Sequence, residues 1–385
     1  MSAARFFFGA IIALSVIGGM NYYVALRLFQ WIKLIFPHIS AKIYIGIYVV
    51  VFLSLFLGFA RSFIPAPLVI KNIMSWISAH WMGAFLYLLM FFVIADVAVL
   101  LGCFVKLIPS PIPSSIRFCS GLLVVLLTTS CVSYGLYNAT QIKRVFYDIQ
   151  LRESPLPHEL KIVLISDLHL GALNSETNLD KVVQGTNEMA PDIVCMVGDI
   201  FNGEFAAIQN PDKVIELFKS INTTYGVYAC LGNHDGGSSL GQMMNLLKES
   251  NVTLLNDEYV IIDDRLVLIG RLDPSPIGGY GSMKRTDIAY ILASIDTALP
   301  IIVMDHTPAR IEEYGNDVAL ILSGHTHRGQ IFPGNLVTRA MYTVDYGLYQ
   351  KGTGSPHVIV TSGAGTWGMP MRVGTNSEIV SIVLR

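Results

Sequence analysis

The sequence predicts an α/β domain preceded by an all-α membrane region of four helices. Hydrophobic residues make up 52% of the 385 residues and charged residues 14%, whereas soluble globular chains are about 25% charged. Residues 1–140 carry eight basic residues and one acidic residue, while residues 141–385 carry 18 basic and 27 acidic residues. Only this second part alternates short β-branched runs with amphipathic stretches and Gly, Pro or Asn turns, a pattern typical of α/β domains.

The first 140 residues contain four apolar stretches, and together they predict a transmembrane domain. They cover residues 6–26, 43–60, 82–105 and 118–140, close to the roughly 20 residues that a helix needs to cross a bilayer. Their backbone groups have to be satisfied internally, so each stretch is expected to be helical. The first is too long for a signal peptide and lacks a small-residue cleavage pattern. We therefore expect a multi-pass integral protein of the cell membrane.

The charges of the loops predict the orientation of this domain in the membrane, and one acidic residue within a span is a candidate functional residue. Lys and Arg residues favour cytoplasmic termini by one charge, so the domain after residue 140 is expected on the cytoplasmic side. Asp96 lies inside the third stretch, and an intramembrane carboxyl group is a functional-site hypothesis by default. A plainer interpretation is that Asp96 is protonated or bonded to Thr128 or Thr129.

The part from 141 to 385 places metal-binding residue types after apolar runs of strand length. A first strand is expected near 145–151, where apolar and polar residues alternate. Five later runs are each followed by such a cluster: Asp167 and His169, then Asp199, then Asn233, His234 and Asp235, then Asp305 and His306, and finally His325 and His327. Because ligand sites form at the carboxyl ends of strands in α/β sheets, the five clusters are expected to converge.

The residue types in these clusters favour a site for two metal ions. Imidazole, carboxylate and amide ligands suit Mn, Fe or Zn, and the five cysteines show no paired spacing that would indicate a structural zinc site. Five of the nine histidines fall inside the clusters. Two cations about 3.5–4 Å apart can bridge a phosphoryl group and generate hydroxide near neutral pH.

The ordered motifs resemble those of the calcineurin-like metallophosphoesterase family. The resemblance covers residues 145–385 and is carried by SDLHLG, VGD, LGNHD, SGHTHRGQ and the tail SGAGTWGMPMRVGTNSEI. Within the family these motifs are most similar to the membrane-anchored YaeI/YkuE-like subgroup, in the lineage of the lipid A pathway UDP-diacylglucosamine pyrophosphatases. The resemblance implies a four-layer αββα sandwich, with two mixed β-sheets flanked by helices, over residues 141–385.

The resemblance also implies roles for individual residues and a cofactor of two divalent metal ions, with Mn favoured. One metal would be held by Asp167, His169, Asp199 and His327. The other would be held by Asp199, Asn233, His306 and His325, so that Asp199 bridges the two. His234 would lie near the leaving oxygen as a general acid or charge stabiliser, and Asp235 is expected to orient the His234 ring, as carboxylates commonly do for histidines.

Two segments depart from the usual family pattern. Arg328 follows GHTH where relatives carry glycine, and its guanidinium is either solvated or a substrate-binding contact to phosphate. Earlier in the chain, the acidic pair that relatives usually carry after the Ile-Gly strand is replaced by Gly270-Arg271-Leu272-Asp273. The following Gly- and Pro-rich segment 274–285 is either a mobile lid or an ordinary surface loop.

These observations predict a membrane-anchored, di-metal hydrolase of phosphoric esters or pyrophosphates. A hydroxide bridging the two metals would attack a phosphodiester or pyrophosphate, and the membrane domain suggests a phosphorylated substrate that is lipid-linked or a nucleotide–lipid. One alternative is a non-catalytic module that binds a phosphorylated ligand for regulation. Another is a transporter gated by the attached domain, but paired intramembrane charges and broken helices are lacking. Nucleic acid is not an expected partner, since the second part has net negative charge.

Overall fold

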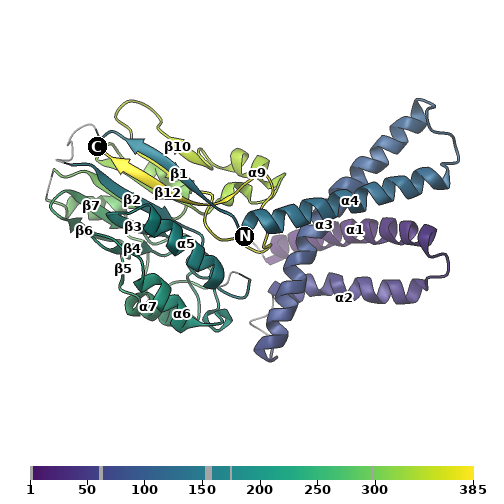
Figure 1. Cartoon of the computed structure of the whole chain (residues 1–385), viewed down its shortest axis with the longest axis horizontal. Helices are drawn as coiled ribbons and strands as arrows, with labels where there is room; N and C mark the ends of the chain where they lie inside the picture. The colour runs from purple at the N-terminus through teal and green to yellow at the C-terminus, as the bar shows by residue number, and fades with distance from the viewer. Residues whose placement is uncertain (1–2, 60–63, 152–157, 174–175, 297) are drawn as a thin grey trace. The chain divides into compact units, whose positions relative to one another are not determined.

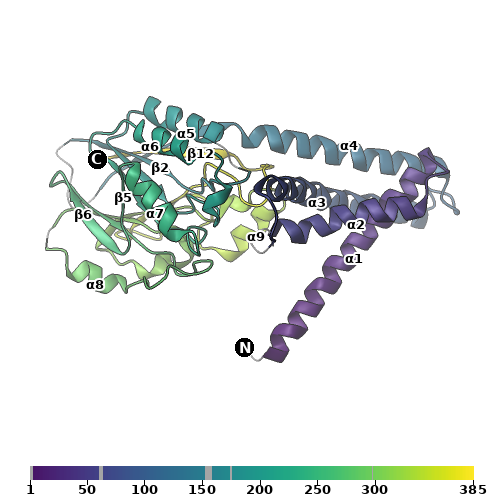
Figure 2. The same ribbon diagram turned by 90° about the horizontal axis from the view of Figure 1, so that it is seen from below.

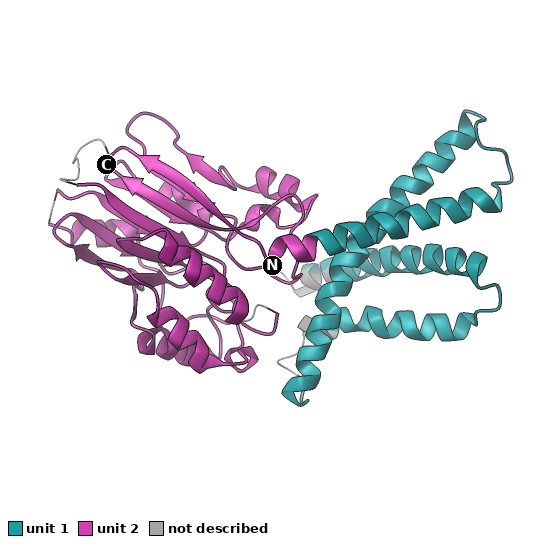
Figure 3. Ribbon diagram, in the orientation of Figure 1, with its two compact units in different colours: residues 1–134 teal, residues 135–385 magenta. Residues whose placement is uncertain are grey.

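The computed structural model describes residues 3–59, 64–151, 158–173, 176–296 and 298–385. The chain divides into two compact units, residues 1–134 and 135–385 (Figure 3). The division falls inside the last helix of the apolar part, so the final turn of that helix belongs to the second unit.

The described part of the first unit is helical. Its helices are α1 (Ala3–Ile35), α2 (Ala41–Phe59), α3 (Leu68–Phe104) and α4 (Ser114–Ala139). Among the described residues, three segments are long and apolar enough to cross a membrane: Ile11–Ile35, Leu68–Phe104 and Ser114–Ala139. The apolar segment of α2 over described side chains, Ala41–Phe56, is shorter. A fourth span over 43–60 therefore stays a prediction.

Asp96 on α3 pairs with α1, not with a threonine. Tyr23 Oη donates to Asp96 Oδ2 over 2.6 Å, and Arg27 Nη2 forms an ion pair with Asp96 Oδ1. The expected bond to Thr128 or Thr129 was wrong, because α1 places a cation and a phenol beside the carboxyl group. Arg27 and Asp96 lie in two helices able to cross a membrane, so the expectation that paired intramembrane charges are lacking was also wrong. Such pairing is the usual way for a chain to hold a carboxylate among apolar helices.

The described residues of the second unit form two mixed six-stranded sheets (Figure 1). The first has the order β1 (Ile142–Ile149), β12 (Ser377–Leu384), β2 (Leu160–Ile165), β3 (Ile193–Val197), β4 (Val227–Cys230) and β5 (Val252–Leu254). The second has the order β10 (Gly347–Tyr349), β11 (His357–Val360), β9 (Val318–Ser323), β8 (Ile301–Met304), β7 (Leu266–Gly270) and β6 (Glu258–Ile262). Strands β2 to β5 run parallel, as do β7, β8, β9 and β11.

The inner faces of the two sheets pack on each other, and helices cover the outer faces. Along β2, Ile162 and Leu164 join the core between the sheets, whereas Val163 and Ile165 join the core under the helices. This alternation follows from the two-residue period of a strand. The helices on the first sheet are α5 (Glu176–Glu188), α6 (Pro211–Lys219) and α7 (Leu240–Glu249).

The outer face of the second sheet is covered by α8 (Ile288–Ala293) and the 3₁₀ turn η3 (Pro308–Glu313). Figure 2 shows α8 on the side of this unit opposite α5 and α6. Shorter elements are the 3₁₀ turns η2 (Phe205–Ala207) and η4 (His327–Gly329) and the helix α9 (Gly334–Met341). The prediction of two mixed sheets flanked by helices is confirmed.

Candidate metal centre

The five predicted clusters lie at strand ends on both sheets. Strands β2, β3 and β4 of the first sheet lead into Asp167, Asp199 and Asn233, and strands β8 and β9 of the second lead into His306 and His325. The backbone at the predicted ligands is unusual. Asp167, His169, Asp199, His325 and His327 have φ angles of 56°, 47°, 50°, 69° and 48°. Non-glycine residues rarely adopt positive φ, and such strain clusters at functional sites.

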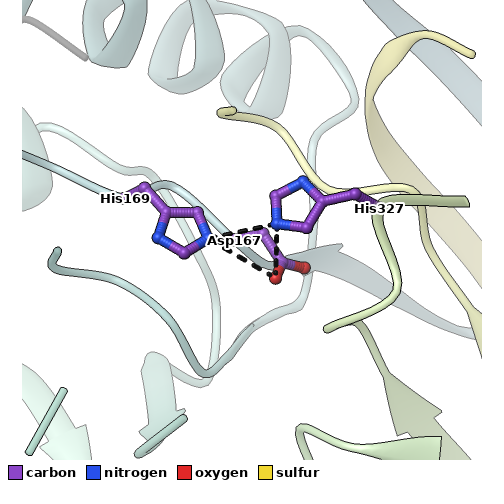
Figure 4. A group of neighbouring side chains, drawn as sticks. All are labelled: Asp167, His169 and His327. Atoms are coloured by element: carbon purple, nitrogen blue, oxygen red, sulfur yellow. Dashed lines mark hydrogen bonds and ion pairs between the residues drawn. The ribbon is translucent and has the colours of Figure 1, made fainter. Parts of the chain in front are cut away.

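The first group of converging side chains comprises Asp167, His169 and His327 (Figure 4). Their candidate ligand atoms lie within 4.8 Å of one another, and all three residues are buried. His327 Nε2 is 3.3 Å from Asp167 Oδ1 and 3.1 Å from His169 Nε2. Two imidazole nitrogens and a carboxylate oxygen facing one centre are suitable donors for a divalent transition metal.

The second group comprises Asp199, His306 and His325. His306 Nδ1 donates to the Val197 carbonyl over 2.9 Å, so the lone pair of a neutral ring is on Nε2. That Nε2 lies 3.2 Å from Asp199 Oδ2 and has no hydrogen-bond partner among the described residues. A buried lone pair facing a carboxylate oxygen requires a proton or a cation between them. The donor set therefore fits a metal ion.

Asp199 joins the two groups. Its Oδ2 lies 3.6 Å from His169 Nε2 of the first group and 3.2 Å from His306 Nε2 of the second. Its Oδ1 accepts the backbone N–H of His234 over 2.8 Å, which fixes the carboxylate plane. Asn233 Oδ1 lies 2.9 Å from His325 Nδ1 at the edge of the second group. All seven predicted ligands are thus brought together.

Burial sets the protonation of these ligands. It lowers the pKa of His169 to about 3 and that of His325 to about 4, because the charged ring loses solvation. Burial likewise raises the pKa of Asp167 to about 6. Neutral imidazole is the form that binds metals, so His169 and His325 are ready as ligands at neutral pH. The neighbouring carboxylates of Asp199 and Asp167 instead raise the pKa of His306 well above its ordinary value, so this ring releases a proton when a metal binds.

Comparisons with known proteins agree with this geometry. Residues 160–329, which contain every predicted ligand, match the family model described as calcineurin-like phosphoesterase. An uncharacterized metallophosphoesterase of Campylobacter jejuni is 30% identical over 70% of this chain and 71% of its own length. One from Aquifex aeolicus is 31% identical over 62% of this chain and 90% of its own length. A Danio rerio transmembrane protein with metallophosphoesterase domain is 31% identical over 69% of this chain and 62% of its own length.

The chain belongs to the calcineurin-like phosphoesterase family. Members hydrolyse phosphoric esters at a di-metal centre, and the two groups around Asp199 are the candidate centre in this calcineurin-like phosphoesterase. The Danio rerio relative is named for a transmembrane region as well, in keeping with the apolar helices here.

His234 lies beside the first group in this calcineurin-like phosphoesterase. Its ring centroid is 5.1 Å from that of His169 and 5.7 Å from that of Trp367. Burial lowers the pKa of His234, so the ring is neutral at pH 7. A neutral imidazole keeps one ring N–H, which can donate a hydrogen bond to a departing oxygen and stabilise its charge.

Asp235 has other partners than the expected His234 ring. Its Oδ1 accepts the backbone N–H of Phe201 and its Oδ2 that of Gly232, each over 2.8 Å. Among the described residues it makes no hydrogen bond to the His234 side chain. We therefore place its role in holding the loop that carries Asn233, not in orienting the His234 ring.

Arg372 is a buried residue near the centre that the sequence interpretation did not single out. Its guanidinium donates to the carbonyls of Ser362, Gly363 and Gly365 over 2.6, 3.2 and 2.7 Å. The same group lies 3.3 Å from His327 Nδ1. Burial lowers its pKa to about 10, which still leaves it charged at neutral pH. The signal in the sequence was a lone charged residue in the Gly-rich segment 362–377.

Arg328 and the Gly- and Pro-rich segment are held by protein contacts. The guanidinium of Arg328 lies over the Tyr346 ring, 4.2 Å from its centroid, and its role in substrate binding stays a prediction. The segment 274–285 contacts the loop that carries Asn233: Ile277 donates its N–H to the Asn233 carbonyl, and the Tyr280 hydroxyl donates to the Gly232 carbonyl. This segment therefore supports the ligand loop directly.

Gly198 offers a test of the local packing around the second group. It has φ +71°, and a Cβ there would lie 2.6 Å from the His306 ring. We expect Gly198→Ala to push His306 away and to lower metal affinity about 10- to 100-fold, comparable to losing a residue that orients a ligand. Isothermal titration with Mn²⁺ measures this. Gly241→Ala is the matched control, because a Cβ there meets nothing within 4 Å. Equal affinities would contradict the assignment of His306.

Proposed function

We propose that this protein is a membrane-anchored, di-metal hydrolase that cleaves a phosphodiester or pyrophosphate bond. The observation that carries the proposal is the position of Asp199 Oδ2, within 3.6 Å of a ligand nitrogen in each of two groups. A single carboxylate oxygen between two sets of buried donors is the arrangement expected of a shared ligand. It suits a pair of metals better than one ion.

The proposed ligands are divided between the two metals. Asp167, His169 and His327 would hold one and Asn233, His306 and His325 the other, with Asp199 shared. Two divalent ions there would supply an activated water and would offset the charge that builds on a phosphoryl group. Mn is the metal that we favour for both positions of this donor set, with Fe or Zn as alternatives.

The chain's own residues orient the reacting groups and stabilise the charge that develops on them. His234, neutral at pH 7 and 5.1 Å from the His169 ring, would donate a hydrogen bond from its ring N–H to the departing oxygen. The His234 backbone N–H donates a hydrogen bond to Asp199, and this bond fixes the position of His234 relative to the shared carboxylate. Asp235 would keep the same loop in place through Phe201 and Gly232.

The membrane unit supports the class of substrate that we propose. In the part of the chain that the structure describes, three helices able to cross a bilayer precede the candidate ligands, so a lipid-linked phosphate or nucleotide–lipid pyrophosphate would share a plane with the enzyme. The quoted motifs resemble those of the YaeI/YkuE-like subgroup, and this resemblance supports the proposal of a substrate like that of the UDP-diacylglucosamine pyrophosphatases. We propose the cell membrane as its location, with the catalytic unit on the cytoplasmic side.

A second candidate is a regulatory module that binds a phosphorylated ligand without turnover. It needs the same buried donors but no group beside them to stabilise a departing oxygen. The His234 ring N–H, with its ring centroid 5.1 Å from that of His169, could supply that stabilisation and favours catalysis over binding alone.

The test uses detergent-purified full-length protein that is stripped of metal and reloaded with Mn²⁺, Zn²⁺ or Mg²⁺. It is assayed on a generic phosphodiester, a phosphomonoester and a UDP–lipid pyrophosphate. We expect metal-dependent turnover that Asn233→Ala and His325→Ala abolish, while His158→Ala, an exposed histidine in the same unit, leaves it unchanged. Two bound metals without turnover on any substrate would favour the binding module.

A further inference from the structure

Helix α9 presents its apolar residues outward. None of its eight residues is buried. Leu336, Val337 and Met341 keep 56%, 57% and 69% of their surface exposed. These positions share one side of an α-helix, because residues four apart are neighbours. A helix at the surface of a soluble domain normally turns this side inward.

The polar side of α9 faces the protein. Thr338 Oγ1 donates to Asp345 Oδ2 over 2.7 Å, and Thr326 Oγ1 donates to the Asp345 carbonyl. The helix also packs closely on the turn η4: a Cβ at Gly329 would lie 2.1 Å from the Asn335 nitrogen. The outward apolar side is therefore fixed by the fold and cannot rotate inward without breaking these bonds.

The apolar surface extends beyond the helix. Phe332, just before α9, is 43% exposed, and Trp367 is 42% exposed. Gln330 links the two segments, since its side-chain amide donates to the Trp367 carbonyl and accepts the Trp367 N–H. We call these five residues, Phe332, Leu336, Val337, Met341 and Trp367, the α9 face.

The α9 face is connected to the last turn of a helix able to cross a membrane. Phe332 donates its N–H to the Val373 carbonyl over 2.8 Å. A Cβ at Gly135, within the last turns of α4, would lie 2.8 Å from Val373 Cγ2. Asn138 Nδ2 donates to the carbonyls of Arg372 and Thr375. Phe332 and the end of α4 thus contact the same short segment.

That end of α4 has the character of a bilayer surface. The candidate span runs to Ala139, and Tyr137 next to its end is 66% exposed. Aromatic rings with a polar tip are enriched at this level of a membrane. The α9 face is joined to this end of α4 through one segment, Met371–Thr375.

We propose that the α9 face rests on the bilayer that α4 crosses, with its apolar side chains at the headgroup–acyl boundary. An outward apolar side flanked by a basic residue is the signature of an interfacial helix, and Arg339 is the exposed basic residue of α9. The contact would hold Trp367, and with it the His234 side of the metal centre, next to the lipid surface. The proposal goes beyond hydrolysis and does not require it.

The test uses full-length protein in nanodiscs of phosphatidylcholine and phosphatidylglycerol. A photoreactive p-benzoylphenylalanine replaces Val337 or Met341, and lipid adducts are measured by mass spectrometry after irradiation. The matched control carries the label at Tyr290 on α8, which is 75% exposed. We expect at least about tenfold more lipid adduct at 337 and at 341 than at 290. Equal yields at both sites and at the control would overturn the proposal.

A second comparison separates docking from mere closeness to the membrane. Adding Val337→Asp to the protein labelled at 341 should lower the adduct yield about tenfold, because a charge opposes burial at the boundary. An unchanged yield would mean that α4 alone brings the helix near lipid. A cross-linked dimer in place of lipid adducts would assign the face to a second copy of the chain. Neither readout needs turnover, so the result is independent of the proposed enzymatic activity.

Discussion

Replacing Asp199 with asparagine is expected to lower kcat/KM by at least about 100-fold, which is more than the loss of a residue that only orients a ligand. The amide keeps an oxygen for the His234 N–H but removes the negative charge that lies within 3.6 Å of both donor groups. Metal content should fall from two ions per chain toward one. Steady-state kinetics and elemental analysis of the same preparation measure the two effects together.

The control for this substitution is Asp212→Asn, which removes an exposed carboxylate on α6. It should leave both rate and metal content unchanged. Asp199→Asn protein that retains two metals and more than about a tenth of the rate would show that Asp199 is not a shared ligand. The candidate ligands would then have to be assigned to the two metals in a different way.

Arg372→Met is expected to destabilise the catalytic unit by about 3 kcal/mol or more. The substitution leaves the buried carbonyls of Ser362 and Gly365 without their donor, and each unsatisfied group costs about 1–3 kcal/mol. The loop that carries these carbonyls holds Asp167 in turn, because Gly365 donates its N–H to the Asp167 carbonyl over 2.9 Å. Metal affinity should therefore fall about 10- to 100-fold as well.

Thermal unfolding of the detergent-purified protein and titration with Mn²⁺ check this prediction. Arg144→Met is the matched control: Arg144 pairs with Glu188 at the surface, where an ion pair contributes about 0–1 kcal/mol. Arg372→Lys should recover only part of the loss, since an ammonium cannot reach several carbonyls as the planar guanidinium does. An unchanged midpoint and affinity for Arg372→Met would rule out the anchoring role.

Local patterns were enough to predict where each cluster of metal-binding residue types falls along the chain. The runs Ile162–Ile165 and Ile193–Val197 are strand-length and β-branched, and the polar residues after them fall where strands end. This part of the folding code is local, because strand propensity and turn chemistry act over a few residues. The resemblance of the motifs to the family predicted the αββα layers, and the two sheets of the structure confirm them.

Contacts between distant segments could not be predicted in this way. The partners Asp257 and Arg271, which form a buried ion pair 3.1 Å apart, come from two strand ends. Asp96 and Arg27 come from two helices whose relative register no periodicity specifies. Asp235 looked like a partner of the adjacent His234, yet its oxygens accept backbone groups at Phe201 and Gly232. Sequence adjacency is a poor guide wherever buried backbone amides compete for a carboxylate.

The sequence by itself determined the two-part organisation, the order of the metal-binding residue types and the family. These depend on composition and on short-range patterns. The tertiary structure alone decided that Asp199 Oδ2 lies between the two groups, that Arg372 anchors the loop behind Asp167, and that α9 turns its apolar side outward. The physical reason is that packing of two sheets brings together residues far apart in the sequence, such as Asp167 and His325, 158 positions apart, and burial then selects which polar groups can pair.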